Sequence, residues 1–277
     1  MDEASRVERD ELAREQIRER MSHVKHKLLV LSGKGGVGKS TVAANLALSL
    51  VLSGHRTGLM DIDIHGPSIP TMLGLQNAKP VSTGEAIKPV GLGENFKVMS
   101  IGFFLHKESD AVIWRGPLKF SLIRQFLKDV EWGDLDYLIV DSPPGTGDEP
   151  LSICQLMPNI DGAIVVTTPQ DVSVIDVKKC ITFCKEVKVP VLGIIENMAG
   201  LDCPHCGGHI DLFKAGGGER LSRETGATLL GSIPIDPQIV QASDSGASFM
   251  QRHADSPAAK AFCATVEKVL DRLGDEP

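Results

Sequence analysis

The stretch that decides the fold class is Leu31-Ser-Gly33-Lys-Gly-Gly-Val-Gly38-Lys39-Ser40-Thr41. It matches the pattern G-x-x-x-x-G-K-[ST] and stands between an apolar run at 28–32 and a helical stretch at 39–53, as this pattern requires. The glycines let backbone N–H groups close around phosphate oxygens, and the N-terminus of the following helix adds partial positive charge. The stretch therefore predicts a P-loop that binds the phosphates of a nucleotide.

Strand-like runs alternate with helical stretches through the rest of the chain. Runs rich in Val, Ile and Leu, such as 138–141 and 163–166, are typical of strands buried on both faces of a parallel sheet. This alternation predicts an α/β fold, with a doubly wound, mainly parallel β-sheet flanked by helices and ligands at the carboxyl ends of the strands. We expect strands at 28–32, 57–61, 96–101, 137–141, 162–167, 191–196 and 228–232. We expect helices at 39–53, 117–130, 148–157, 171–187, 217–226, 237–243 and 256–273.

The 277 residues contain no internal repeat and no long linker. We therefore expect one P-loop ATPase domain over 27–277, with a metal-binding C-x-x-C loop at about 200–210. Residues 1–26 are expected to form a charged N-terminal helical arm that is solvated, with its helix over 5–22. Residues 76–95, rich in Gly and Pro, are expected to form a surface excursion.

Composition argues against several partners. The net charge of −7 argues against a basic surface that binds nucleic acid, and an aromatic content of 4% argues against an aromatic one. No apolar run approaches the roughly 20 residues of a membrane span. The N-terminal segment is too rich in acidic residues for a transit peptide. The six cysteines, with no signal peptide before them, are expected as reduced thiols in the cytoplasm.

The P-loop residues have separate roles. Lys39 is expected to reach the β- and γ-phosphates, and the Ser40 hydroxyl to ligate Mg²⁺. Asp141 ends a strand in the Walker B arrangement and is expected to organise the Mg²⁺ through water, followed by a phosphate-sensing loop at 142–148. No guanine-specific motif appears, so we expect the nucleotide to be ATP. The residues expected at the phosphates are Gly33, Lys34, Gly35, Gly36, Val37, Gly38, Lys39, Ser40 and Thr41.

A second motif, Cys203-Pro-His-Cys206, indicates a metal or cluster site. Two thiolates at i and i+3 on a turn relaxed by Pro and Gly can grip one ion or one cluster edge, but they are half of a tetrahedral set. A two-fold axis through two copies of the chain would complete a four-cysteine site that suits Zn²⁺ or an iron–sulfur cluster. The motif lies in a Gly-rich loop, so a redox C-x-x-C is a weaker interpretation.

The other candidate ligands have simpler interpretations. Cys180 and Cys184 share one face of a predicted helix and are expected in the apolar core. Cys154 and Cys263 are single, and the same interpretation applies to them. His205 and His209 lie near enough to ligate a metal but are expected as exposed turn residues.

Together these motifs resemble those of the Mrp/ApbC family of iron–sulfur cluster carrier ATPases, within the ParA/MinD-like class of P-loop proteins. The resemblance covers about residues 27–245. It rests on Lys34-Gly-Gly-Val-Gly-Lys-Ser-Thr41, Asp61-Ile-Asp63-Ile-His-Gly-Pro-Ser68, Trp114-Arg-Gly-Pro117, Asp141-Ser-Pro-Pro-Gly-Thr-Gly-Asp148, Glu196-Asn-Met198, Cys203-Pro-His-Cys206 and Phe213-Lys-Ala-Gly-Gly-Gly218.

The resemblance implies a homodimer that carries a 4Fe–4S cluster between its C-x-x-C pairs, on Cys203 and Cys206 of each chain. It also implies transfer of this cluster to apo iron–sulfur proteins, with cluster-scaffold proteins as further partners. Nucleic acid and membrane are not expected partners. No cysteine precedes Cys154, so the additional N-terminal four-cysteine site of some eukaryotic relatives is not expected.

The resemblance also assigns roles to single residues. Lys34 would act like an arginine finger across the dimer, a solvated lysine being the alternative. Asp63, rather than Asp61, would orient the attacking water. Asn197 would contact adenine, although a residue of a strand-end turn is the other interpretation. The segment with Pro234 and Asp236 would lie against the purine.

Two other functions stay open. A spatial-organisation switch of the MinD/ParA kind would need a basic amphipathic C-terminal helix for a membrane, or a basic face for DNA, whereas the C-terminal helix here has balanced charge. An ATPase with a structural zinc at its dimer interface would use the same cysteines.

Overall fold

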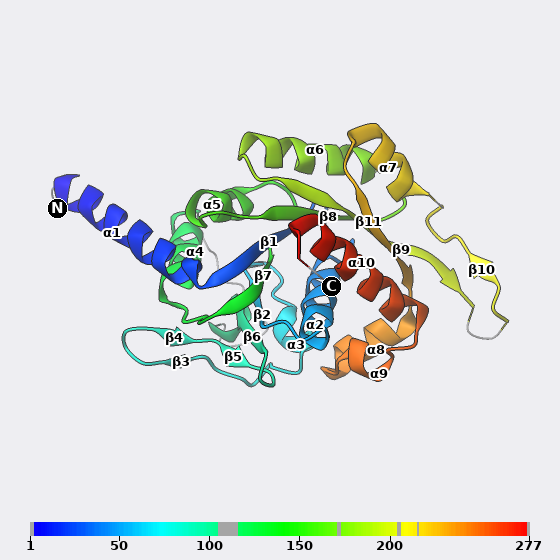
Figure 1. The fold of residues 1–277 in the computed structure, drawn as a ribbon, viewed down its shortest axis with the longest axis horizontal. Coiled ribbons are helices and arrows are strands. Elements are labelled where there is room, and N and C mark those ends of the chain that lie inside the picture. The colour runs from blue at the N-terminus through cyan, green and yellow to red at the C-terminus, as the bar shows by residue number, and fades with distance from the viewer. Residues whose placement is uncertain (1–2, 105–115, 171–172, 204–205, 215, 276–277) are drawn as a thin grey trace.

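The computed structural model describes residues 3–104, 116–170, 173–203, 206–214 and 216–275. Within this part of the chain, nine strands form one sheet in the order β10-β9-β8-β1-β7-β2-β6-β5, and β11 pairs with β9. The short strands β5 and β10 are antiparallel to their neighbours, and the other pairs are parallel. This arrangement, with helices on both faces (Figure 1), confirms the predicted fold class.

The strands of the sheet are β1 (Val24–Ser32), β2 (Thr57–Asp61), β5 (Val90–Gly91), β6 (Phe96–Ser100), β7 (Leu135–Asp141), β8 (Gly162–Thr167), β9 (Val191–Asp202), β10 (His209–Ile210) and β11 (Leu229–Ile235). A separate ribbon joins β3 (Val81–Ser82) and β4 (Ile87–Lys88). The helices are α1 (Glu3–Ser22), α2 (Lys39–Leu52), α3 (Ile69–Met72), α4 (Gly116–Asp129), α5 (Asp148–Leu156), α6 (Ser173–Glu186), α7 (Gly217–Thr225), α8 (Pro237–Ser245), α9 (Phe249–Arg252) and α10 (Pro257–Leu273), with a 3-10 turn η1 (Ile101–Phe104).

The sheet is buried on both faces because successive residues of its strands point to opposite sides. In β1, Leu28 and Val30 join the core under α2 and α10, while Leu29 and Leu31 join the core under α1, α4 and α5. A smaller cluster lies between the sheet and helices α6 and α7. No helix in the described part of the chain is both long enough and apolar enough to span a membrane.

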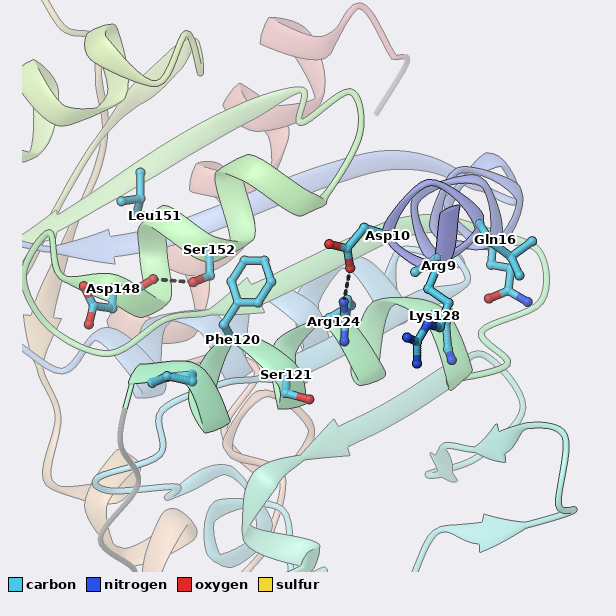
Figure 2. A pocket seen from close by; sticks show the side chains of 13 residues that line it. Arg9, Asp10, Gln16, Phe120, Ser121, Arg124, Lys128, Asp148, Leu151 and Ser152 are labelled. Carbon is cyan, nitrogen blue, oxygen red and sulfur yellow. Dashed lines mark hydrogen bonds and ion pairs between the residues drawn. The ribbon is translucent and has the colours of Figure 1, made fainter. Parts of the chain in front are cut away.

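The prediction of a solvated N-terminal arm is wrong for the second half of that arm. Ile17 and Met21, four residues apart on one face of α1, are buried in the core that also holds α4. Arg124 of α4 and Asp10 of α1 form an ion pair of 2.9 Å, drawn in Figure 2. The N-terminal turns of α1 extend away from the body of the molecule (Figure 1).

Two strands are longer than predicted because pairing extends them. β1 begins at Val24, opposite Leu135 of β7, so the assumed domain start at 27 falls inside a strand. β9 continues past Asn197 to Asp202 because it pairs with β11 and then turns back into β10. The helices α3 and α9, of one turn each, were not predicted because four residues carry no period. Residues 171–172, the expected start of α6, lie outside the described residues.

Candidate functional site

The P-loop joins the carboxyl end of β1 to the N-terminus of α2. Gly36 and Gly38 have φ angles of 80° and 78°, in the left-handed region that favours glycine. Gly38 is the N-cap of α2 and makes no side-chain cap hydrogen bond, so the first N–H groups of the helix are available to an anion. The cavity at this turn, of about 230 Å³, is lined by Ser32, residues 34–41, Asp63, Ser68, Met72 and Pro144.

Lys39, which lines this cavity, is paired with Asp141, the predicted Walker B aspartate. The Nζ atom of Lys39 lies 2.5 Å from Oδ1 of Asp141 and 3.3 Å from Oγ of Ser40. The side chain of Lys39 is 6% exposed and that of Asp141 is 0% exposed. The other carboxylate oxygen of Asp141, Oδ2, is buried with no hydrogen-bond partner among the described residues. An unpartnered carboxylate oxygen beside a serine hydroxyl is the oxygen donor set that Mg²⁺ prefers, so these residues fit the ion.

A second buried carboxyl group lies beside that of Asp141. Asp61 of β2 is paired in register with Asp141 of β7, and burial followed by the charge of Asp141 raises the pKa of Asp61 to about 8. Burial also raises the pKa of Asp141, while Lys39 lowers it. Asp61 accepts hydrogen bonds from Ser100 Oγ at 2.7 Å and from the N–H of Asp63 at 3.0 Å. A cation bound beside these two carboxyl groups would favour their ionised forms.

Asp63, the predicted water-orienting residue, lines the P-loop cavity, whereas the lining residues do not include Asp61. Its Oδ1 atom accepts the N–H groups of His65 and Gly66, each at 3.2 Å. These bonds fix the carboxylate at the mouth of the P-loop, and its role in hydrolysis stays a prediction.

The cysteine loop, residues 203–208, follows the end of β9. The N–H of Cys203 donates to the carbonyl of Gly208 at 2.9 Å, and the N–H of Gly207 donates to the carbonyl of Cys203 at 2.8 Å. Cys206 is exposed and Cys203 is partly exposed. Among the described residues, which omit His205, no group of three or more His, Cys, Asp or Glu side chains could hold a metal ion. Within the described residues, this loop therefore presents two thiols of a metal site rather than a complete set.

The remaining candidate ligands near this loop or in the core are less suited to metal. His209 is exposed and lies between Asp202 and Asp211, at 2.7 and 3.1 Å, and hydrogen bonds to these two carboxylates raise its pKa. Burial raises the pKa of Cys180 and of Cys184 to about 12, so both thiols stay protonated, and their predicted position in the core is confirmed. The same prediction is wrong for Cys263, which is exposed.

Residues 23–270 match the family described as ParA, the NUBPL iron-transfer P-loop NTPases. The chain belongs to this family. The match confirms the resemblance inferred from the motifs, and it covers both the P-loop and the cysteine loop.

Individual relatives agree with the family. An iron–sulfur cluster carrier protein of Methanocaldococcus jannaschii is 50% identical over 257 residues, which are 93% of this chain and 88% of that protein. A nucleotide-binding protein of Archaeoglobus fulgidus, solved in complex with ADP and with cobalt found in it, superposes with a TM-score of 0.77 at 40% identity, over 90% of this chain and 96% of that one. The MinD cell division protein of Aquifex aeolicus, with a TM-score of 0.64 over 89% and 97% of the two chains at 22% identity, shows the fold alone.

Two further site residues predicted from the family make contacts within this chain. The Nζ atom of Lys34 donates to Oε1 of Gln170 at 3.0 Å. The buried side chain of Asn197 donates through Nδ2 to the carbonyl of Val37 in the P-loop at 2.9 Å. Asn197 is thus hydrogen-bonded to the backbone of the P-loop. The sequence did not predict this contact because Val37 and Asn197 are 160 residues apart.

The other predicted adenine residues lie elsewhere. Pro234 and Asp236 line a second cavity, of about 390 Å³, whose lining residues include Gln238 and none of the P-loop. Asp236 is also the N-cap of α8, where its carboxylate accepts the N–H of Gln238 at 2.9 Å. Contact of these residues with a purine stays a prediction.

Several residues near the site were given no role by the sequence patterns. Ser68, the N-cap residue of α3, and Met72, within α3, line the P-loop cavity, and α3 is too short to leave a periodic signal. Glu196 is buried and accepts the N–H of Gly218 at 2.7 Å and the hydroxyl of Ser232 at 2.9 Å, which ties β9 to the start of α7. Of the motifs predicted to matter, Trp114, Arg115, Pro204, His205 and Ala215 lie outside the described residues.

Proposed function

We propose that this protein is an ATP-hydrolysing carrier that holds an iron–sulfur cluster between two subunits and delivers it to apo-proteins. Membership of an iron-transfer family and 50% identity to an iron–sulfur cluster carrier protein support this function. We further propose a 4Fe–4S cluster, apo iron–sulfur proteins and cluster-scaffold proteins as partners, and the cytoplasm, where thiols stay reduced, as its location.

Strand β9 is the main structural support for the proposal, because it connects the P-loop to the cysteine loop. In β9, Asn197 contacts the carbonyl of Val37 in the P-loop, and the end of the same strand leads directly into Cys203. Glu196 beside it holds the first turn of α7. A change in the P-loop on binding or hydrolysis of ATP therefore has a short, packed route to the cluster ligands. Such a link is what a nucleotide-controlled carrier requires.

The nucleotide chemistry follows from the arrangement of five side chains. Lys39 would leave Asp141 to contact the β- and γ-phosphates, and Asp63 would orient water towards the γ-phosphate. Ser40 would hold Mg²⁺ directly and Asp141 would hold it through water, where the ion neutralises phosphate charge. Lys34 would leave Gln170 and stabilise the phosphates bound to the partner subunit.

The cluster chemistry requires two chains. Cys203 and Cys206 supply two thiolates, and an iron–sulfur cluster is held by four. A two-fold axis beside the exposed cysteine loop would supply the other pair. The cluster is the cargo, and a loop that exposes its ligands suits both loading and release.

Anaerobic reconstitution tests this function. We expect wild-type protein incubated with ferrous iron and sulfide to gain equal amounts of iron and sulfide, visible absorbance, and a dimeric mass by light scattering. We expect Cys203→Ala to lose the cluster, while Cys263→Ala, at an exposed cysteine far along the chain, retains it. Phosphate release from ATP, absent in Lys39→Ala, tests the ATPase part.

Three results would count against the proposal. Stoichiometric zinc without iron in anaerobically purified protein would favour the structural-zinc alternative. A monomer in the presence of both metal and ATP would contradict the shared cluster. Full iron content in Cys203→Ala would show that the cluster is held elsewhere.

A further inference from the structure

Three polar side chains meet outside the P-loop cavity, from three different elements. The Nζ atom of Lys119, in α4, lies 2.6 Å from Oε1 of Glu149 and 2.9 Å from Nε2 of His65. The side chains of Lys119 and Glu149 are 14% and 8% exposed, whereas that of His65 is 65% exposed. Since an ammonium group has only donors, His65 accepts this hydrogen bond through Nε2.

His65 and Glu149 each belong to a segment that carries a carboxylate of the candidate site, Asp63 or Asp141. His65 follows Asp63, and the N–H of His65 donates to Oδ1 of Asp63 at 3.2 Å. Glu149 lies in the first turn of α5, immediately after the loop at 142–147 that follows Asp141. Helix α5 packs against α4 (Figure 2). Lys119 therefore connects the Asp63 segment to the segment that begins with Asp141.

The energetics of such a pair favour a positioning role over a stabilising one. Desolvation of two charges offsets most of their attraction, so a buried ion pair is often replaceable by neutral side chains at little cost in stability. The ammonium group of Lys119 nevertheless keeps two hydrogen bonds with defined directions, to Glu149 and to His65. What the pair supplies is a fixed distance between two segments that both line the P-loop cavity, one through Asp63 and the other through Pro144.

We propose that Lys119, held by Glu149, is a positioning residue that fixes His65 and thereby orients the carboxylate of Asp63 towards the attacking water. This inference rests on the proposed ATP hydrolysis. When the loop at 142–147 rearranges around the γ-phosphate, Glu149 moves with it, and Lys119 transmits this movement to the Asp63 segment. The connection makes the position of the water-orienting residue depend on the nucleotide bound.

The first test separates turnover from binding. We expect His65→Ala to lower kcat for ATP hydrolysis about 10- to 100-fold, because a small misplacement of a reacting group costs this much, with nucleotide Kd changed less than about twofold. His65→Gln should recover part of the rate, since its carbonyl oxygen can accept from Lys119. The double variant Lys119→Met with Glu149→Gln should show the same loss without leaving a buried charge unpaired. Lys128→Met, which removes a partly exposed pair with Asp129 from the same helix, should retain the wild-type rate.

The second test does not depend on turnover. Hydrogen exchange of the backbone amides at positions 65 and 66, measured with Mg–ADP bound, should be faster in His65→Ala and in the double variant than in wild type. Exchange in β8, in the centre of the sheet, should be unchanged. A wild-type kcat together with wild-type exchange in His65→Ala would overturn the inference. If wild-type protein itself does not hydrolyse ATP, the proposed ATPase function fails, and the exchange rates still decide whether Lys119 holds the Asp63 segment.

Discussion

Replacing Lys39 by Met should destabilise the nucleotide-free protein as well as abolish nucleotide binding. Lys39 and Asp141 are both buried and 2.5 Å apart, so the substitution leaves an unpaired carboxylate inside the protein. Removing one partner of a buried ion pair costs about 3–5 kcal/mol. Because Asp141 can take up a proton instead, we expect the lower part of this range, about 3 kcal/mol, in the free energy of unfolding at pH 7.

The pH dependence has a definite sign. Lys39 lowers the pKa of Asp141, which burial raises, so its removal raises the folded-state pKa further. In the variant the native state then holds a proton that an unfolded aspartate releases above about pH 4. Since the native state binds more protons, the free energy of unfolding falls as the pH rises from about 4 towards the folded-state pKa of Asp141. The cost of Lys39→Met should therefore be larger at pH 8 than at pH 5.

Urea unfolding of the nucleotide-free proteins measures this cost. The double variant Lys39→Met with Asp141→Asn removes both charges, so its free energy of unfolding should return to within about 1 kcal/mol of wild type, although neither the single nor the double variant should bind ATP. An unchanged midpoint for Lys39→Met at pH 8, or a double variant no more stable than the single one, would refute the reasoning.

Three other outcomes are expected. A heterodimer of one Lys34→Ala chain and one Lys39→Ala chain should regain some ATPase activity, because one pocket keeps its own Lys39 and receives Lys34 from the partner. No recovery in a verified heterodimer would mean that Lys34 acts within its own subunit or that both pockets must hydrolyse ATP together. Cys180→Ala should retain full iron content after reconstitution and lose about 1–3 kcal/mol in thermal or urea unfolding, since this thiol is buried in the core. Ile17→Ala should lower the free energy of unfolding by about 2–4 kcal/mol, because Ile17 packs against α4. Val7→Ala, on the exposed part of α1, should lower it by less than about 0.5 kcal/mol. Equal effects would mean that α1 does not pack against α4 in solution.

Local patterns predicted most of the fold and part of the site. The alternation of apolar runs and helical stretches placed the main strands and the longer helices, and the P-loop pattern placed Lys39 and Ser40. The same reasoning treated α1 as solvated, because two buried positions, Ile17 and Met21, are a weak signal in a helix dominated by charge. It also ended β9 too early, since the extension to Asp202 depends on pairing with β10 and β11.

The sequence by itself determined the elements whose information is local: the P-loop, the strand-end aspartates, the two thiols of the cysteine loop and the period of the longer strands and helices. The tertiary structure decided which of these elements meet. Lys39 reaches Asp141 across 102 residues because β1 and β7 are neighbours in register, and Lys119 joins His65 to Glu149 because α4 packs beside α5. The physical reason is that a hydrogen bond depends on strand order, register and helix packing, which no short window of residues contains.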